Sequence, residues 1–244
     1  NIVTLRTLDI GSDKEVPDNI QIGTIAKNPA LGLRGIRYSL SERNIFITQI
    51  KAMLRAGMYG KLRILIPMVT NINEILKTKE LINEAIDLLK KEKKRFSKDY
   101  ELGIMIEVPS TAIQASSLAK YVDFMSIGTN DLVQYILATD RIDDEVGSLY
   151  DSTDPSVLVL IKKVIDAGKK FNKDVTVCGE IAGDVKYTKL LLGLGLRSFS
   201  MHPRAIPEIK KVIISSDISI IKKKISKILN TFDSTEREKL ISSL

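Results

Sequence analysis

Short apolar segments alternate with amphipathic segments along almost the whole chain. About six segments carry the aliphatic and β-branched run that is typical of a buried strand: 1–8, 62–69, 102–108, 122–127, 174–180 and 197–201. The stretches that follow them have helical spacing, roughly at 41–57, 71–94, 110–120, from 132 onward, 155–171 and 188–192. Three more helices are predicted at 205–214, 218–229 and 235–244. This alternation predicts an α/β fold in which a parallel sheet is covered by helices.

Local signals support several of these boundaries. Asn71 and Glu74 form a plausible capping pair at the start of a long helix. Asp154 followed by Pro155 is typical of an N-cap with proline at the first helical position. A loop with turn residues, including Pro17 and Gly23, follows the first strand.

Composition places the chain among globular proteins. It has 244 residues, of which 44% are hydrophobic, and a mean hydropathy of +0.03. We expect one domain over 1–244, because no linker or repeat interrupts the pattern. No apolar run approaches membrane-spanning length, so membrane insertion is not expected. Cys178 is the sole cysteine, which excludes an intrachain disulfide and predicts a reducing, cytoplasmic location.

The formal charge of +7 raises the question of nucleic-acid binding. The lysines cluster on predicted helix surfaces, at 90–94, 169–170 and 222–224, without interleaved aromatic residues, and the chain has no tryptophan. This pattern indicates solvated faces, so no nucleic-acid partner is expected. A positive field instead favours a small anionic substrate or an acidic partner protein.

One strand exit has the composition of a binding site. The apolar run from Val122 to Ile127 breaks at Gly128, and Thr129, Asn130 and Asp131 follow before helical spacing resumes. Glycine allows close approach of a ligand or backbone, and an aspartate is a hard oxygen ligand for a divalent cation. The alternative is a turn with a helix cap, since Asn and Asp serve both purposes.

Other predicted strands also end in polar residues. Arg6, Glu107, Cys178 and Glu180 lie at or just beyond the carboxyl ends of their apolar runs. In a (β/α) barrel these ends form one face, which carries the active site. A single such residue is usually a capped or salt-bridged strand end, but their recurrence predicts a shared site.

The residue types suit a phosphorylated ligand. Glu107 and Asp131 supply two carboxylates, enough for a Mg²⁺ ion that keeps several waters. Arg6, Arg34 and Arg141 offer planar forks for phosphate or carboxylate, although surface ion pairing explains the two loop arginines, Arg34 and Arg141, equally well. Together with a thiol that can donate or accept a proton, these groups suggest a small phosphorylated carboxylic acid.

Several ordered motifs resemble one family. They are Arg6-Thr-Leu-Asp-Ile-Gly11, Asn28-Pro-Ala-Leu-Gly-Leu-Arg-Gly-Ile-Arg37, Gly103-Ile-Met-Ile-Glu107, Ser126-Ile-Gly-Thr-Asn-Asp-Leu132, Leu137-Ala-Thr-Asp-Arg141, Leu149-Tyr150, Cys178-Gly-Glu-Ile-Ala-Gly-Asp184 and Phe199-Ser-Met201. Over nearly the whole chain they resemble the C-terminal, phosphoenolpyruvate (PEP)-binding domain of enzyme I of the bacterial sugar phosphotransferase system, a phosphoenolpyruvate-protein phosphotransferase. Pyruvate phosphate dikinase shares this domain, but the residues of the Leu137-to-Arg141 and Cys178-to-Asp184 motifs more closely resemble those of enzyme I.

The resemblance implies a role for each predicted site residue. It implies Mg²⁺ ligands at Glu107 and Asp131. It implies that the substrate's phosphate and carboxylate are held by four residues: Arg6, Arg34, Asn130 and Arg141. It implies that Cys178 is the catalytic acid that protonates the enolate carbon to give pyruvate.

The resemblance also implies partners that this sequence does not contain. The family moves phosphate from PEP to a histidine on a separate N-terminal domain, then to a small phosphocarrier protein for sugar uptake, and it forms homodimers. The motif around that histidine is absent here, and the single histidine, His202, is expected to be structural or to lie at the rim of the site.

The family barrel has eight strands, so the resemblance predicts a TIM-type (β/α) barrel that lacks its first two βα units, as in a fragment of a longer protein. Three alternatives remain open. One is an inactive binding and dimerisation fragment, another is a dikinase-like PEP domain, and the third is a Mg²⁺-dependent carbon–carbon lyase of barrel type.

Overall fold

A computed structural model describes residues 2–9, 28–141 and 143–244. The loop predicted around Pro17 and Gly23 lies outside the described residues. The chain forms two compact units. The first unit is Asn1–Met105 with Tyr121–Asp123, and the second unit is Ile106–Lys120 with Phe124–Leu244.

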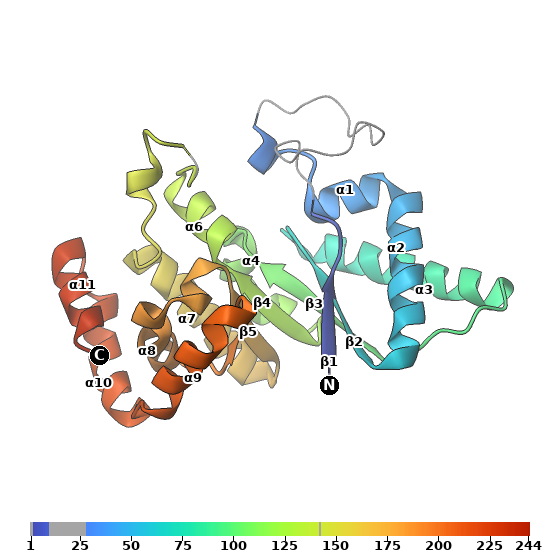
Figure 1. Cartoon of the computed structure of the whole chain (residues 1–244). Coiled ribbons are helices and arrows are strands. Elements are labelled where there is room, and N and C mark those ends of the chain that lie inside the picture. Colours follow the sequence, from blue (N-terminus) through green and yellow to red (C-terminus); the bar gives the residue numbers. More distant parts are fainter. Residues whose placement is uncertain (1, 10–27, 142) are drawn as a thin grey trace. The chain divides into compact units, whose positions relative to one another are not determined.

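The first unit contains parallel strands with helices between them (Figure 1). Its strands are β1 (Ile2–Arg6), β2 (Lys61–Ile66) and β3 (Tyr100–Ile106), whose last residue belongs to the second unit. Its helices are α1 (Gly35–Ser41), α2 (Arg43–Ala56) and α3 (Ile72–Lys91), with short 3-10 helices at Pro29–Leu31 and Gly57–Tyr59. β1 pairs with β2 and β2 with β3, with Arg6 opposite Leu65 and Ile66 opposite Ile104.

The long helix of the first unit begins as the sequence predicts. Asn71 accepts hydrogen bonds from the main-chain N–H groups of Asn73 and Glu74, and the Glu74 side chain accepts from the N–H of Asn71. This reciprocal cap satisfies N–H groups that have no partner within the helix. α2 packs on α3 through buried residues that include Phe46 and Ile50, which shields one side of the strands.

The second unit also consists of parallel strands with helices between them, and it contains more helices than the first. Its strands β4 (Phe124–Gly128), β5 (Asp174–Cys178) and β6 (Ser198–Phe199) are parallel and neighbours in sequence order. Its helices are α4 (Pro109–Ile113), α5 (Ala115–Leu118), α6 (Thr129–Leu137), α7 (Pro155–Phe171), α8 (Val185–Leu194), α9 (Ile206–Ile214), α10 (Ile218–Leu229) and α11 (Ser234–Ser242). Short 3-10 helices lie at Gly147–Leu149, Glu180–Gly183 and Pro203–Ala205.

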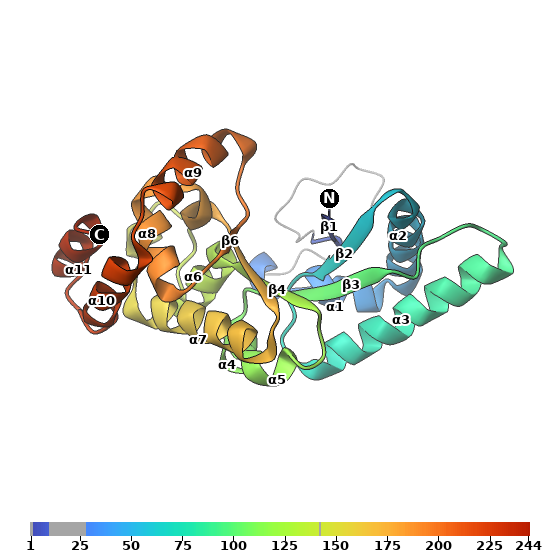
Figure 2. The same ribbon diagram turned by 90° about the horizontal axis from the view of Figure 1, so that it is seen from below.

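The C-terminal helices form an outer layer on the second unit. Figures 1 and 2 show α10 and α11 against α8, on the side of α8 that faces away from β5. The approach of α10 is close because Gly193 of α8 has no side chain. A Cβ atom there would lie 2.4 Å from Cδ1 of Ile225 and 2.7 Å from Cγ2 of Ile221.

Most predicted elements are confirmed, with shifts at their ends. Asp154 caps α7 by accepting from the N–H of Ser156, as its sequence predicts. The predicted helix 110–120 is divided into α4 and α5, and the last strand shortens to Ser198–Phe199. The helix after β4 begins at Thr129 rather than Leu132, so Asn130 and Asp131 lie in its first turn. No helix in the described parts of the chain is long and apolar enough to cross a membrane.

Candidate functional site

In the first unit, two predicted site arginines meet at one carboxylate. Arg34 donates from Nε to Oδ1 of Asp9 at 3.0 Å and from Nη2 to Oδ2 at 2.8 Å. Arg6 places Nη1 3.6 Å from the same Oδ2. Asp9 and Arg34 are buried, whereas the Arg6 side chain is 43% exposed. The two-bond contact fixes the plane of the Arg34 guanidinium.

The backbone explains why Arg34 is held there. Gly35, which begins α1, has a φ of +55°, and a Cβ atom on it would lie 2.6 Å from Cβ of Met68. Ile36 donates its N–H to the carbonyl of Pro67 at 3.1 Å. Only a glycine permits this contact with the segment after β2, so the residue that precedes it, Arg34, is placed beside the end of β2.

In the second unit, the exits of β4 and β5 are joined by hydrogen bonds. Thr129 donates from Oγ1 to the carbonyl of Cys178 at 2.8 Å, and the N–H of Glu180 donates to Oδ1 of Asn130 at 3.1 Å. Between them Gly179 has a φ of +95°, and a Cβ atom on it would lie 2.3 Å from Oγ1 of Thr129. The glycine therefore lets the first turn of α6 contact the residues after β5.

The single cysteine lies at this junction. Cys178 is the last residue of β5, is partly exposed, and donates from Sγ to the carbonyl of Ile127 at 3.3 Å. The hydroxyl of Ser126 donates to the same sulfur at 3.6 Å. A carbonyl oxygen can only accept a hydrogen bond, so the S–H form of Cys178 can donate to Ile127, whereas the Ser126 hydroxyl can donate to the thiol or to the thiolate.

A third arginine and a tyrosine border the same junction. Arg141 donates from Nη1 to Oε1 of Glu180 at 3.1 Å. Tyr150 donates its hydroxyl to the carbonyl of Asn130 at 3.2 Å. Burial raises the pKa of Tyr150 to about 12; nearby Glu180 and Asp131 act in the same direction, and Arg141 opposes them. Sequence analysis assigned no role to this tyrosine, although the Leu149-Tyr150 pair is among the family motifs.

The two predicted metal ligands belong to the second unit. Glu107 is 2% exposed and lies between β3 and α4, and Asp131 lies in the first turn of α6. α4 and α6 pack against each other. Among the described residues, no group of three or more His, Cys, Asp or Glu side chains is arranged to hold a metal. Two carboxylates still fit Mg²⁺, which takes few protein ligands and completes its shell with water and substrate oxygens.

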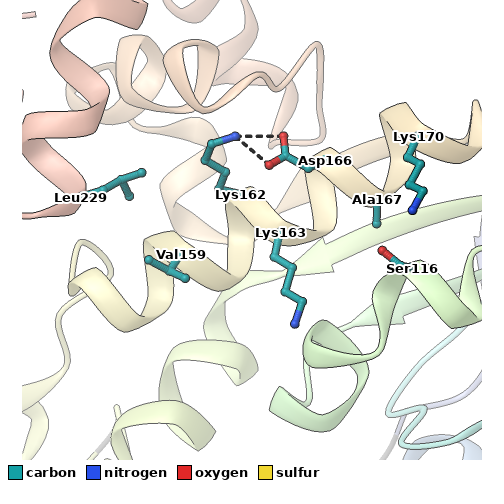
Figure 3. A pocket seen from close by; sticks show the side chains of 8 residues that line it. All are labelled: Ser116, Val159, Lys162, Lys163, Asp166, Ala167, Lys170 and Leu229. Atoms are coloured by element: carbon teal, nitrogen blue, oxygen red, sulfur yellow. Dashed lines mark hydrogen bonds and ion pairs between the residues drawn. The ribbon is translucent and has the colours of Figure 1, made fainter.

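Other features of the second unit lie apart from these residues. Figure 3 shows a hollow lined by α5, α7 and α10, and none of the predicted site residues lines it. His202 is exposed, and its Nδ1 accepts from the N–H of Arg204 at 3.3 Å, so it caps the short helix that follows. That the arginines around Asp9 and the groups around Cys178 serve one ligand stays a prediction.

A sequence model of the family described as "PEP-utilising enzyme, PEP-binding domain" matches residues 1–218. The chain belongs to this family. Curated relatives named phosphoenolpyruvate-protein phosphotransferase support the assignment. The protein from Cupriavidus necator is 41% identical over 99% of this chain, that from Buchnera aphidicola 46% over 93%, and that from Staphylococcus aureus 48% over 86%.

The similarity covers only part of those relatives. The matched region is 41% of the Cupriavidus protein, 39% of the Buchnera protein and 36% of the Staphylococcus protein. This member of the PEP-utilising family therefore spans about two fifths of the length of the relatives it matches.

Solved structures of low sequence identity show the fold. A citrate lyase from Burkholderia xenovorans is similar over 75% of this chain and 56% of its own, with a TM-score of 0.52 at 16% identity. A malate synthase from Haloferax volcanii is similar over 74% and 54%, with a TM-score of 0.53 at 11% identity. These similarities confirm the predicted fold class for this member of the PEP-utilising family, an α/β fold of the TIM-barrel type.

Proposed function

We propose that this chain is the PEP-binding part of a phosphoenolpyruvate-protein phosphotransferase. In that reaction the bond between phosphorus and the enol oxygen breaks, the phosphoryl group passes to a histidine imidazole, and the enolate takes up a proton to become pyruvate. The family match over 1–218 and the relatives of that name support the proposal.

The observation that carries the proposal is the position of the thiol at the end of β5. The Sγ atom of Cys178 lies 3.3 Å from the carbonyl oxygen of Ile127, to which an S–H group can donate, and Cys178 lies beside polar groups that suit an anionic ligand. An acid that protonates carbon must carry its proton before the reaction, which this contact favours. Cys178 is thus the proposed donor to the methylene carbon of the enolate.

The basic and amide side chains are the proposed ligands of the substrate's phosphate and carboxylate: Arg6, Arg34, Asn130 and Arg141. Arg34 and Arg141 are already oriented by Asp9 and Glu180, so little side-chain entropy is lost when an anion binds. Fixed cationic groups also stabilise the negative charge that develops on both fragments as the phosphoryl group leaves.

Glu107 and Asp131 are the proposed residues that hold Mg²⁺. A bound Mg²⁺ would neutralise phosphate charge at the site. The carboxylates of this chain fix where that ion is held, while the arginines and Asn130 orient the substrate.

The complete reaction needs parts that are proposed from the resemblance. They are a histidine on a separate N-terminal domain, a small phosphocarrier protein that receives the phosphate for sugar uptake, and a second copy of this chain in a homodimer. The proposed location is the cytoplasm. The relatives are more than twice as long as the matched region, which leaves room for a further domain in proteins of that kind.

Calorimetric titration with PEP tests the binding role. We expect the chain to bind PEP in the presence of Mg²⁺ and to bind it more weakly after chelation, whereas unphosphorylated pyruvate binds more weakly under both conditions. Equal affinity for PEP and unphosphorylated keto acids would instead favour a carbon–carbon lyase. Supplying a histidine domain in trans and following pyruvate release then separates a competent enzyme from an inert binding and dimerisation module.

A further inference from the structure

The C-terminal helix α11 inserts one arginine into the second unit. Arg237 is 2% exposed, although it lies in a helix rich in charged residues. Its Nη1 donates to the carbonyls of Thr231 and Phe232, each at 3.2 Å, and its Nη2 donates to Oδ2 of Asp151. Within the described residues its Nε has no hydrogen-bond acceptor. Burying a guanidinium with one unsatisfied N–H costs folding free energy. The ion pair with Asp151 compensates the buried charge, so this contact is the one to explain.

Asp151 bonds both to the C-terminal helix and to the segment before α7. Its Oδ1 accepts from the N–H and the hydroxyl of Thr153, at 2.8 and 2.7 Å, while its Oδ2 accepts from Arg237. Burial raises the pKa of the Asp151 carboxyl, but the bonds from Thr153 and the nearby Arg237 outweigh it, so its pKa is below the ordinary value. The ionised carboxylate therefore ties α11 to this segment at neutral pH.

The residue before Asp151 carries the connection to the candidate site. Tyr150 donates its hydroxyl to the carbonyl of Asn130, which lies in the first turn of α6 beside Asp131. The contacts thus run without interruption from Arg237 to Asp151, along one peptide bond to Tyr150, and from its hydroxyl to Asn130. Each step is a hydrogen bond or a covalent bond between described residues of the second unit.

Arg237 lies outside the region that the family model matches. The family match ends at residue 218, whereas α11 begins at Ser234. The residues predicted to bind substrate or metal are within the match, and Arg237 is not. The Nη1 contacts of Arg237 stay within the turn between α10 and α11, whereas its Nη2 contact reaches the segment before α7.

We propose that Arg237 is a positioning residue that acts through Asp151 and Tyr150 to hold the first turn of α6, and with it Asn130 and Asp131, in the geometry that binds PEP. The part of this statement that concerns PEP rests on the proposed function. The part that concerns α6 stands without a ligand and can be tested separately.

Hydrogen exchange of the complete chain without ligand tests the positioning itself. Arg237→Met and Tyr150→Phe should each accelerate exchange of the main-chain N–H groups in the first turns of α6. Glu238→Gln is the matched control, because Glu238 also lies in α11 and its substitution removes only an exposed ion pair with Lys186 of α8, which should leave α6 unchanged. Unchanged exchange of α6 in a folded Arg237→Met protein would overturn the proposal. If that variant does not fold, Arg237→Lys and Tyr150→Phe decide in the same way.

PEP titration in the presence of Mg²⁺ then tests the consequence for binding. Arg237→Met and Tyr150→Phe should each weaken PEP binding about three- to tenfold, the effect of losing one hydrogen bond. Because Arg237 and Tyr150 act through one chain of contacts, the double variant should have the same PEP affinity as the single variant that binds PEP more weakly. Additive losses, or a folded Arg237→Met protein with wild-type affinity, would refute the connection. A wild-type chain that fails to bind PEP would refute the proposed function, while the exchange experiment would still decide the role of Arg237.

Discussion

The Sγ atom of Cys178 lies 3.3 Å from the carbonyl oxygen of Ile127, on the neighbouring strand. This relationship distinguishes the thiol from a nucleophilic cysteine, which is activated by nearby cations or a helix N-terminus that stabilise the thiolate. Here the carbonyl of Ile127 accepts from the protonated form, while the Ser126 hydroxyl donates to the sulfur in either form. The contact therefore suits a cysteine that delivers a proton rather than an electron pair.

Replacement of Cys178 by alanine should separate chemistry from binding. We expect pyruvate formation, measured with the histidine domain supplied, to fall about 10²- to 10⁴-fold, the range for losing a positioned acid. The dissociation constant for PEP, measured by calorimetry, should change less than about threefold, because the thiol contributes at most one weak hydrogen bond. Parallel losses of binding and turnover would show that Cys178 is not the proton donor.

Gly179→Ala should destabilise the second unit. Its φ of +95° is unfavourable for a residue with a side chain, and the new Cβ would lie 2.3 Å from Oγ1 of Thr129. We expect the free energy of unfolding in urea to fall by about 1–3 kcal/mol. Gly147→Ala is the control: its Cβ would lie 3.5 Å from the nearest atom, so stability should change little. Equal effects of the two substitutions would contradict this account of Gly179.

Tyr150→Phe should alter the dependence of stability on alkaline pH. The folded-state pKa of about 12 exceeds the ordinary value of 10.0, so the folded chain holds the phenol proton more tightly than the unfolded chain does. The corresponding stability is complete below about pH 10 and is lost between about pH 10 and 12. Urea unfolding at pH 9, 10 and 11 should therefore show a steeper decline for the wild type than for Tyr150→Phe. Parallel declines would mean that Tyr150 titrates normally.

Glu107→Gln and Asp131→Asn should each weaken the Mg²⁺ dependence of PEP binding. Loss of even an outer-shell partner lowers metal affinity about tenfold or more, so loss of a direct ligand should have at least that effect. The measurement is PEP affinity as a function of Mg²⁺ concentration. Asp166→Asn is the control, because this exposed carboxylate pairs with Lys162 on the same helix, α7, and lines a hollow apart from the predicted site residues (Figure 3). A normal Mg²⁺ dependence in both test variants would exclude these residues as ligands.

The sequence predicted the elements well because their signals are local. Hydrophobic spacing located the strands, and the caps at Asn71 and Asp154 act within three residues of the helix start. The start of α6 was placed too late, because polar Thr129, Asn130 and Asp131 interrupt the apolar spacing on which the prediction relied. The first turn of a helix is a favourable place for such residues, so they belong to the helix.

The contacts between site residues were not predictable, because they depend on segments far apart in the chain. Asp9 and Arg34 are 25 residues apart, and nothing in the sequence indicates that they share two hydrogen bonds. Arg237 lies in a polar stretch that predicts a surface helix, yet the packing of α11 buries it. In the sequence, Tyr150 stands out only as part of a family motif. Its hydrogen bond to the carbonyl of Asn130 could be found only in the folded structure.

The missing side chain of Gly193 has a consequence beyond local packing. α10 approaches α8 at a distance set by the absence of a single carbon atom, and α11 follows α10 by a short turn. A methyl group at this point would overlap the side chains of Ile221 and Ile225, so these side chains or the helix that carries them would have to move. On our proposal for Arg237, a movement of α10 would pass through α11 to the first turn of α6, so a substitution that changes no polar group should weaken ligand binding.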